Sequence, residues 1–185
     1  LILNKFSSIS TELPVSGFYD ADYFRVQLEF IKMLNMHGLY MQSFTVMREL
    51  IASIGMLGIT GKYAGKKIDS KDGRKYRKRF GEMFVTLCQF PKNEWRYQDE
   101  NKKQNIAPKQ LNDFSKILPF YEQLEDKGIG SELQSFVKDM LDYRNGFNHA
   151  WTEKNARLED VREKADYYFR KLESVINNLD KEKLL

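Results

Sequence analysis

The chain has 185 residues, of which 42% are hydrophobic and 30% charged, so it fits one soluble globular domain rather than a disordered segment. No apolar run approaches the ~20 residues that a membrane helix needs, so we expect no membrane association. The single cysteine, Cys88, excludes an internal disulfide and a multi-cysteine metal site, and favours the reducing cytoplasm as the location.

Two helices are predicted in the first third of the chain. Apolar residues recur at helical spacing from Ala21 to Met36, too densely for an exposed helix, with Asp20 as the expected N-cap and His37-Gly38 as the stop. A second helix is expected from about Leu39 to Met56. Residues 1–17 precede this helical region, and we expect them to connect it to a further N-terminal region.

A basic loop and a third helix follow. Residues 58–73 are rich in glycine and lysine, and a helix is predicted over Arg74–Phe90. Nine basic and only two acidic residues lie between residues 62 and 79, so this segment alone is more positive than the whole chain with its formal net charge of +4. Such a patch attracts polyanions through counterion release. The alternative is a solvated loop that leads into a helix face. The candidate phosphate contacts are Lys66, Lys67, Arg74 and Arg77.

The second half of the chain continues the helical pattern after a polar, charged excursion over Pro91–Pro108. One helix is expected over Lys109–Leu124, interrupted by Pro119. Ser131, with Gln134 three residues later, fits a capping box that opens the next helix. A last apolar stripe runs from Leu158 to Leu179. The sequence therefore predicts an all-α helical bundle in residues 18–185.

The most informative stretch lies before this last helix and places an arginine five positions before a histidine, with two amides between them: Arg144-Asn145-Gly146-Phe147-Asn148-His149. Arginine can grip a phosphate through two hydrogen bonds and keeps its charge, whereas histidine exchanges a proton near neutral pH. The pair therefore suits chemistry on a phosphodiester. Asn145 and Asn148 are candidates to orient the phosphate or the imidazole.

Arg144 extends an apolar stripe by one turn beyond Leu133, Val137 and Met140. A buried unpaired charge is costly, so this guanidinium must meet a partner, an interface or a substrate. Positions five apart lie ~140° apart around a helix, so an unbroken helix would separate Arg144 from His149. Either the backbone distorts at Asn145-Gly146, or a second copy in a homodimer completes the site.

A purely structural interpretation of these residues also stands. Arg144 would then pair with Asp142 or a neighbouring helix near the end of its own helix, and His149 would be a core histidine beside Trp151. No group of His, Cys and carboxylate residues has the spacing of a metal site, so we expect neither a metal nor another cofactor.

The segment 142–151 resembles the R-x-x-x-x-H motif of HEPN domains, and it is most similar to the ribonucleases of type III CRISPR systems that join a CARF sensor to a HEPN domain. In these proteins a polar residue commonly follows the arginine, as Asn145 does here. A weaker similarity covers Leu39–Leu50, where a glutamine precedes an Arg-Glu pair. The all-helical layout agrees with the same family.

The resemblance implies a dimeric, metal-independent endoribonuclease that cleaves single-stranded RNA in antiviral defence. It further implies an N-terminal domain, outside this chain, that binds a cyclic oligoadenylate and activates the enzyme. Within the site it implies that Glu49 supports Arg144 across the core.

This chemistry uses the 2′-hydroxyl of RNA as nucleophile, with His149 transferring a proton and Arg144 stabilising the charge on the phosphorane. Its products would be a 2′,3′-cyclic phosphate and a 5′-hydroxyl. Two other functions remain open. One is a non-catalytic helical module that binds RNA or nucleotides or assembles with a toxin–antitoxin partner, and the other is a scaffold with Arg144 at a subunit contact in a CRISPR complex.

Overall fold

The computed structural model describes residues 17–97, 106–148 and 158–185, apart from the side chains of residues 147, 148, 158 and 159. These residues form helices and no strand, which confirms the predicted all-α class. In chain order the elements are α2 (Ala21–Met36), α3 (Tyr40–Leu57), η1 (Gly61–Tyr63), α4 (Lys71–Tyr76), η2 (Arg77–Gly81), α5 (Glu82–Gln89), η3 (Lys92–Glu94), α6 (Pro108–Asp126), α7 (Ile129–Asn148) and α8 (Leu158–Lys181).

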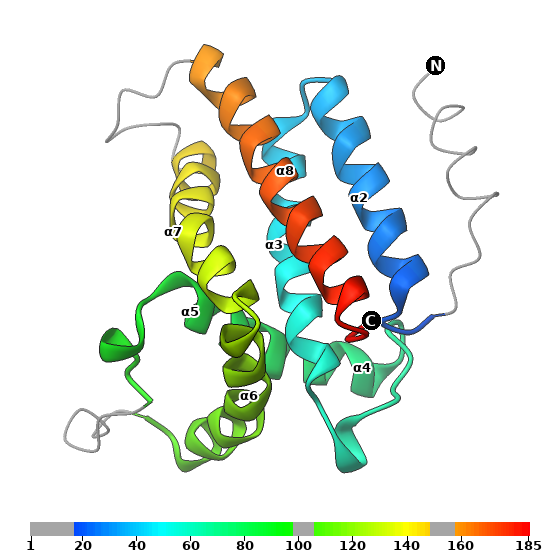
Figure 1. The fold of residues 1–185 in the computed structure, drawn as a ribbon, viewed down its shortest axis with the longest axis vertical. Helices are drawn as coiled ribbons and strands as arrows, with labels where there is room; N and C mark the ends of the chain where they lie inside the picture. The colour runs from blue at the N-terminus through cyan, green and yellow to red at the C-terminus, as the bar shows by residue number, and fades with distance from the viewer. Residues whose placement is uncertain (1–16, 98–105, 149–157) are drawn as a thin grey trace.

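Helix α3 lies at the centre of the bundle. It packs against α2, α7 and α8, and its C-terminal half also meets α5 and η2 (Figure 1). Phe44, Met47, Ile51 and Ile54 of α3 are fully buried, at the 3.6-residue spacing that turns one face to the core. Each fully buried apolar side chain contributes about 1.5–3 kcal/mol relative to an exposed one, so this helix anchors its neighbours.

The first helix begins and ends where the sequence predicts. The Asp20 carboxylate accepts a hydrogen bond from the Tyr23 amide at 2.9 Å and so satisfies one of the free N–H groups of the first turn. At the other end Gly38 adopts a positive φ of 69°, which a glycine tolerates and which turns the chain into α3. The stop predicted at His37-Gly38 is therefore confirmed.

The third helix is longer than predicted and is not uniform. It begins at Lys71 rather than Arg74, because the Ser70 hydroxyl caps it by accepting a hydrogen bond from the Gly73 amide at 3.0 Å. It then continues through η2, a π-helical segment, into α5. Gly81 ends this segment against α3, where a Cβ atom would lie 2.7 Å from the Ala52 carbonyl oxygen.

The predicted capping box at Ser131 is wrong. Gly128 ends the preceding turn with a φ of +76°, and its carbonyl already accepts a hydrogen bond from the Glu132 amide at 3.1 Å. The positive φ of Gly128 turns the chain directly from the end of α6 into α7. Helix α7 therefore begins at Ile129, and Ser131 lies inside its first turn. The predicted interruption at Pro119 is also wrong, because α6 continues as one helix from Pro108 through Pro119 to Asp126.

Candidate active site at the end of helix α7

Arg144 lies where the apolar stripe of α7 predicts. Leu133, Val137 and Met140 are fully buried, and Arg144 follows them by one turn with a half-buried side chain. Its Nε atom is buried and has no hydrogen-bond partner among the described residues. A buried donor without a partner costs about 1–3 kcal/mol, so this position is stable only if another group meets the guanidinium.

The turn before Arg144 is held by aromatic contacts to two other helices. The Tyr143 ring lies 6.3 Å from the Phe44 ring of α3 and 6.1 Å from the Tyr168 ring of α8, measured between centroids. Asp139, one turn earlier on α7, accepts hydrogen bonds from the Tyr168 hydroxyl at 2.6 Å and from Lys164 Nζ at 2.8 Å. The backbone that carries Arg144 is therefore fixed against both α3 and α8.

Lys164 adds a cation to the same region. Its ammonium lies 5.5 Å from the Tyr143 centroid, 5.7 Å from that of Tyr168 and 5.9 Å from that of Tyr167. Its hydrogen bond to Asp139 raises the pKa of Lys164, so the group stays charged. The sequence analysis did not identify this lysine, because the contact between α7 and α8 that places it is not encoded in local spacing.

Helix α7 remains helical through Asn145 and Gly146 as far as Asn148. A distortion of the backbone within this segment, one of the two predicted ways to bring Arg144 toward His149, is therefore not found. Asn145 is exposed to solvent beside Arg144. His149 lies outside the described residues, and Asn148 is described only as the last residue of the helix.

Glu49 is engaged elsewhere than predicted. One carboxylate oxygen accepts a hydrogen bond from Arg48 at 2.8 Å, and the other accepts from Arg77, which also donates to the Glu49 carbonyl at 2.9 Å. The expected contact between Glu49 and Arg144 is not among the described interactions. Glu49 instead links α3 to the π-helical segment η2.

Arg48 extends this group of charges by binding both carboxylate oxygens of Glu82. Burial lowers the pKa of Arg48, but the hydrogen bonds and charge of Glu82 outweigh burial and raise it. The four side chains Arg48, Glu49, Arg77 and Glu82 form a half-buried network that balances two cations with two anions. Arg77 is therefore committed to an internal ion pair rather than free for substrate.

The other predicted phosphate contacts lie far from Arg144. Lys66, Lys67 and Arg74 are exposed in the segment that follows the C-terminal end of α3. Tyr143, next to Arg144, contacts Phe44 near the start of the same helix. At ~1.5 Å per residue, the 13 residues from Phe44 to Leu57 span ~20 Å, so one protomer holds these groups at opposite ends of the bundle (Figure 1).

No group of three or more His, Cys, Asp or Glu side chains in the described part of the chain could hold a metal ion. Within the same residues, no helix has the length and apolar character needed to cross a membrane. Comparison with known proteins gives no relative: no family model, curated protein or solved structure matches this chain.

Proposed function

We propose that the chain is a metal-independent endoribonuclease of the HEPN type, which cleaves single-stranded RNA as a CRISPR-associated antiviral effector. The observation that carries the proposal is the half-buried Arg144, whose Nε lacks a described partner at the end of a helix otherwise fixed by Tyr143 and Asp139. A positioned guanidinium with unused donors suits the binding of a phosphate.

The reaction needs no group beyond RNA and side chains. The 2′-oxygen attacks the adjacent phosphorus as a base takes its proton, and the P–O bond to the 5′-oxygen breaks as that oxygen gains a proton. His149 performs a proton transfer, and Arg144 neutralises charge on the nonbridging oxygens. Asn145 and Asn148 lie between the two in sequence and orient the phosphate. The products are a 2′,3′-cyclic phosphate and a 5′-hydroxyl.

A homodimer completes the site in this proposal. Helix α7 stays regular from Arg144 through Asn148, so the described part of this segment contains no break of the kind that a site within one protomer would need. Two copies related by a two-fold axis would pool two arginines and two histidines in one cleft. Activation by a cyclic oligoadenylate would act through a domain outside this chain.

The test is cleavage of single-stranded RNA in the presence of EDTA by the chain and by its Arg144→Ala and His149→Ala variants. Each substitution is expected to reduce the rate about 100-fold or more, because each removes one element of transition-state stabilisation. Arg25→Ala is the matched control, since Arg25 is an exposed arginine that pairs with Asp180 on another side of the bundle. RNA with a 2′-deoxy nucleotide at the cleaved position should be inert.

Cleavage that requires a divalent metal, or that survives His149→Ala at full rate, would contradict this function. A second function, a non-catalytic RNA-binding module, is favoured by one observation: the exposed Lys66, Lys67 and Arg74 lie at the end of the bundle opposite Arg144. Tight RNA binding without any turnover, lost on charge reversal of those residues, would select that function.

A further inference from the structure

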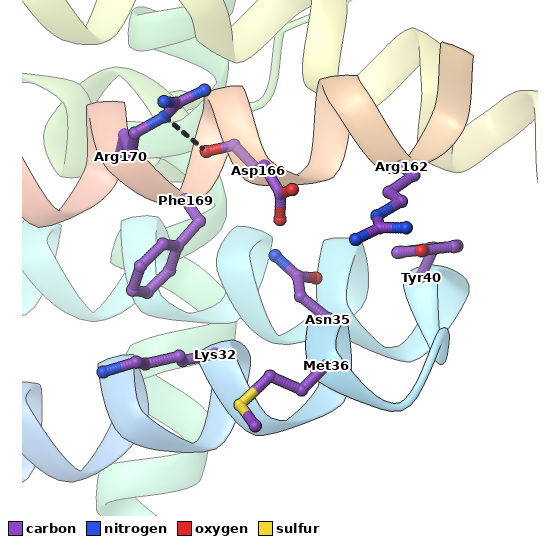
Figure 2. A pocket seen from close by; sticks show the side chains of 8 residues that line it. All are labelled: Lys32, Asn35, Met36, Tyr40, Arg162, Asp166, Phe169 and Arg170. Atoms are coloured by element: carbon purple, nitrogen blue, oxygen red, sulfur yellow. Dashed lines mark hydrogen bonds between the residues drawn. The ribbon is translucent and has the colours of Figure 1, made fainter. Parts of the chain in front are cut away.

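A groove of about 490 Å³ lies between the last turn of α2, the start of α3 and the first half of α8 (Figure 2). Ligand sites in proteins commonly have volumes of about 300–1,000 Å³, so the groove is large enough for a small molecule. It lies on the face of α8 that carries Asp166 and Phe169, whereas the side chains of Lys164 and Tyr168 contact α7. It is therefore separate from the end of α7.

The groove carries more positive than negative charge. Lys32 comes from α2, and Arg162 and Arg170 lie two turns apart on α8, while Asp166 is the one carboxylate that lines it. Lys32 has a loose ion pair with Glu29, at 3.9 Å, and Arg170 Nε donates to the Asp166 carbonyl at 3.3 Å. The guanidinium of Arg162 has no ion pair with any described carboxylate, so its charge is available to an anionic ligand.

The remaining lining side chains combine an apolar surface with hydrogen-bond acceptors. Phe169 and Met36 supply the apolar part, and Met36 is 77% exposed. Asn35 donates a hydrogen bond to the Ala165 carbonyl at 3.2 Å, and its Oδ1 is buried without a partner among the described residues, so the exposed Asp166 carboxylate is the acceptor open to a ligand. Figure 2 shows Asn35 and Asp166 pointing toward one another across the groove, with Arg162 beside the Tyr40 ring.

We infer that this groove binds a nucleotide, either free or as one unit of an RNA strand. The phosphate is held by Arg162, with Lys32 and Arg170 adding charge at the edges. The base lies on the apolar surface of Phe169 and Met36 and donates a hydrogen bond to the Asp166 carboxylate. Adenine, guanine and cytosine offer an exocyclic amino group to this carboxylate, whereas uracil offers only its N3–H.

The test is calorimetric titration of the chain with AMP, GMP, CMP, UMP and inorganic phosphate. We expect the amino-bearing nucleotides to bind more tightly than UMP, and UMP more tightly than phosphate. Arg162→Ala should weaken nucleotide binding roughly tenfold or more, because it removes a charge-assisted contact. Since Arg162 is exposed, the unfolding temperature of this variant should stay that of the original chain. Arg25→Ala, at the other end of α2, is the control and should bind normally.

A second titration uses a short RNA and the Arg144→Ala/His149→Ala variant, in which cleavage is prevented. Arg162-dependent binding of this RNA would show that the groove takes a nucleotide of a strand, and Arg162-dependent binding of mononucleotides alone would show that it takes a free one. No binding of any nucleotide at millimolar concentration, or binding unaffected by Arg162→Ala, would overturn the inference. Because each readout is binding, the outcome is independent of whether the chain cleaves RNA.

Discussion

Two half-buried arginines of this chain meet different surroundings. Arg77 donates to the carboxylate and the carbonyl of Glu49, so its charge is balanced inside the fold. Arg144 has a buried Nε with no described partner. An unpaired buried donor calls for an explanation, and under the proposed function Arg144 binds the phosphate of the RNA.

Tyr19 also has an unpaired polar atom, since its buried hydroxyl has no hydrogen-bond partner among the described residues. Burial, with a smaller contribution from Tyr23, raises the pKa of Tyr19 from 10.0 to about 12. Above pH 10 the unfolded chain loses this proton while the folded chain keeps it. The contribution of Tyr19 to the free energy of unfolding is therefore fully present below pH 10 and is lost as the pH rises toward 12.

Tyr19→Phe removes this contribution and the unpaired hydroxyl together. We expect a free energy of unfolding at pH 7 that is unchanged or higher, and a shallower loss of stability between pH 10 and 12. Denaturant unfolding at a series of pH values measures both quantities. Tyr167→Phe is the control, because Tyr167 is 39% exposed. An equally steep alkaline loss in the Tyr19 variant would count against this account.

Among the elements, the central helix α3 depends on close approach by its neighbours. Gly81 at the end of η2 lies so near α3 that an added Cβ would be 2.7 Å from the Ala52 carbonyl oxygen, and backbone cannot give way as a flexible side chain does. Gly55 of α3 meets Phe84 of α5 in the same way, with an added Cβ 2.4 Å from the Phe84 Cβ. Gly81 and Gly55 therefore determine how closely η2 and α5 approach α3.

Gly81→Ala is accordingly expected to lower the free energy of unfolding by about 1–3 kcal/mol, because the two helices must move apart. Lys78→Ala, an exposed position in the same π-helical segment, is the matched control and should change stability little. Chemical denaturation of both variants gives the comparison. Equal stability of the two would show that the α3–η2 contact adapts without cost.

The sequence predicts the long helices well and their junctions less well. The helix over Ala21–Met36 is confirmed at both ends, because its dense apolar spacing and the Asp20 cap are local features. Ser131 fits a capping box in sequence, yet α7 begins two residues earlier, directly after Gly128. This start could not be predicted, because residue spacing does not reveal that a glycine adopts a positive φ. The position of Arg144 follows from the apolar stripe, whereas the partners of Glu49 depend on how η2 packs against α3.

For the molecule as a whole, the distribution of charge places the proposed RNA-binding segment apart from the proposed catalytic residues. The exposed basic segment follows the C-terminal end of α3, whereas Arg144 lies beside Tyr143, which contacts Phe44 near the start of α3; these two points on α3 are ~20 Å apart. A single-stranded RNA that reaches both must therefore extend over the surface or contact a second protomer. Basic residues at this distance from Arg144 are expected to affect the binding of the strand rather than the rate of bond cleavage.

Lys66→Glu/Lys67→Glu is expected to raise KM for RNA and to weaken its dependence on salt, with kcat at saturating RNA unchanged. Each lost phosphate contact should reduce the logarithmic salt slope by about 0.7 for a single strand. Lys138→Glu/Lys171→Glu changes the net charge equally, on α7 and α8, and should raise KM less. Steady-state cleavage at several salt concentrations measures these effects, and a loss confined to kcat would refute the separation.

The π-helical turn at Arg77–Gly81 has a consequence for chain length. Within it, Arg77 reaches Glu49 on α3 and Arg79 reaches Asp113 on α6, so one helix joins two neighbours through residues only two apart. Deleting a single residue here would restore regular winding and rotate α4 by ~100° relative to α5. One of the two bridges would then break, so this turn should tolerate substitution more readily than deletion.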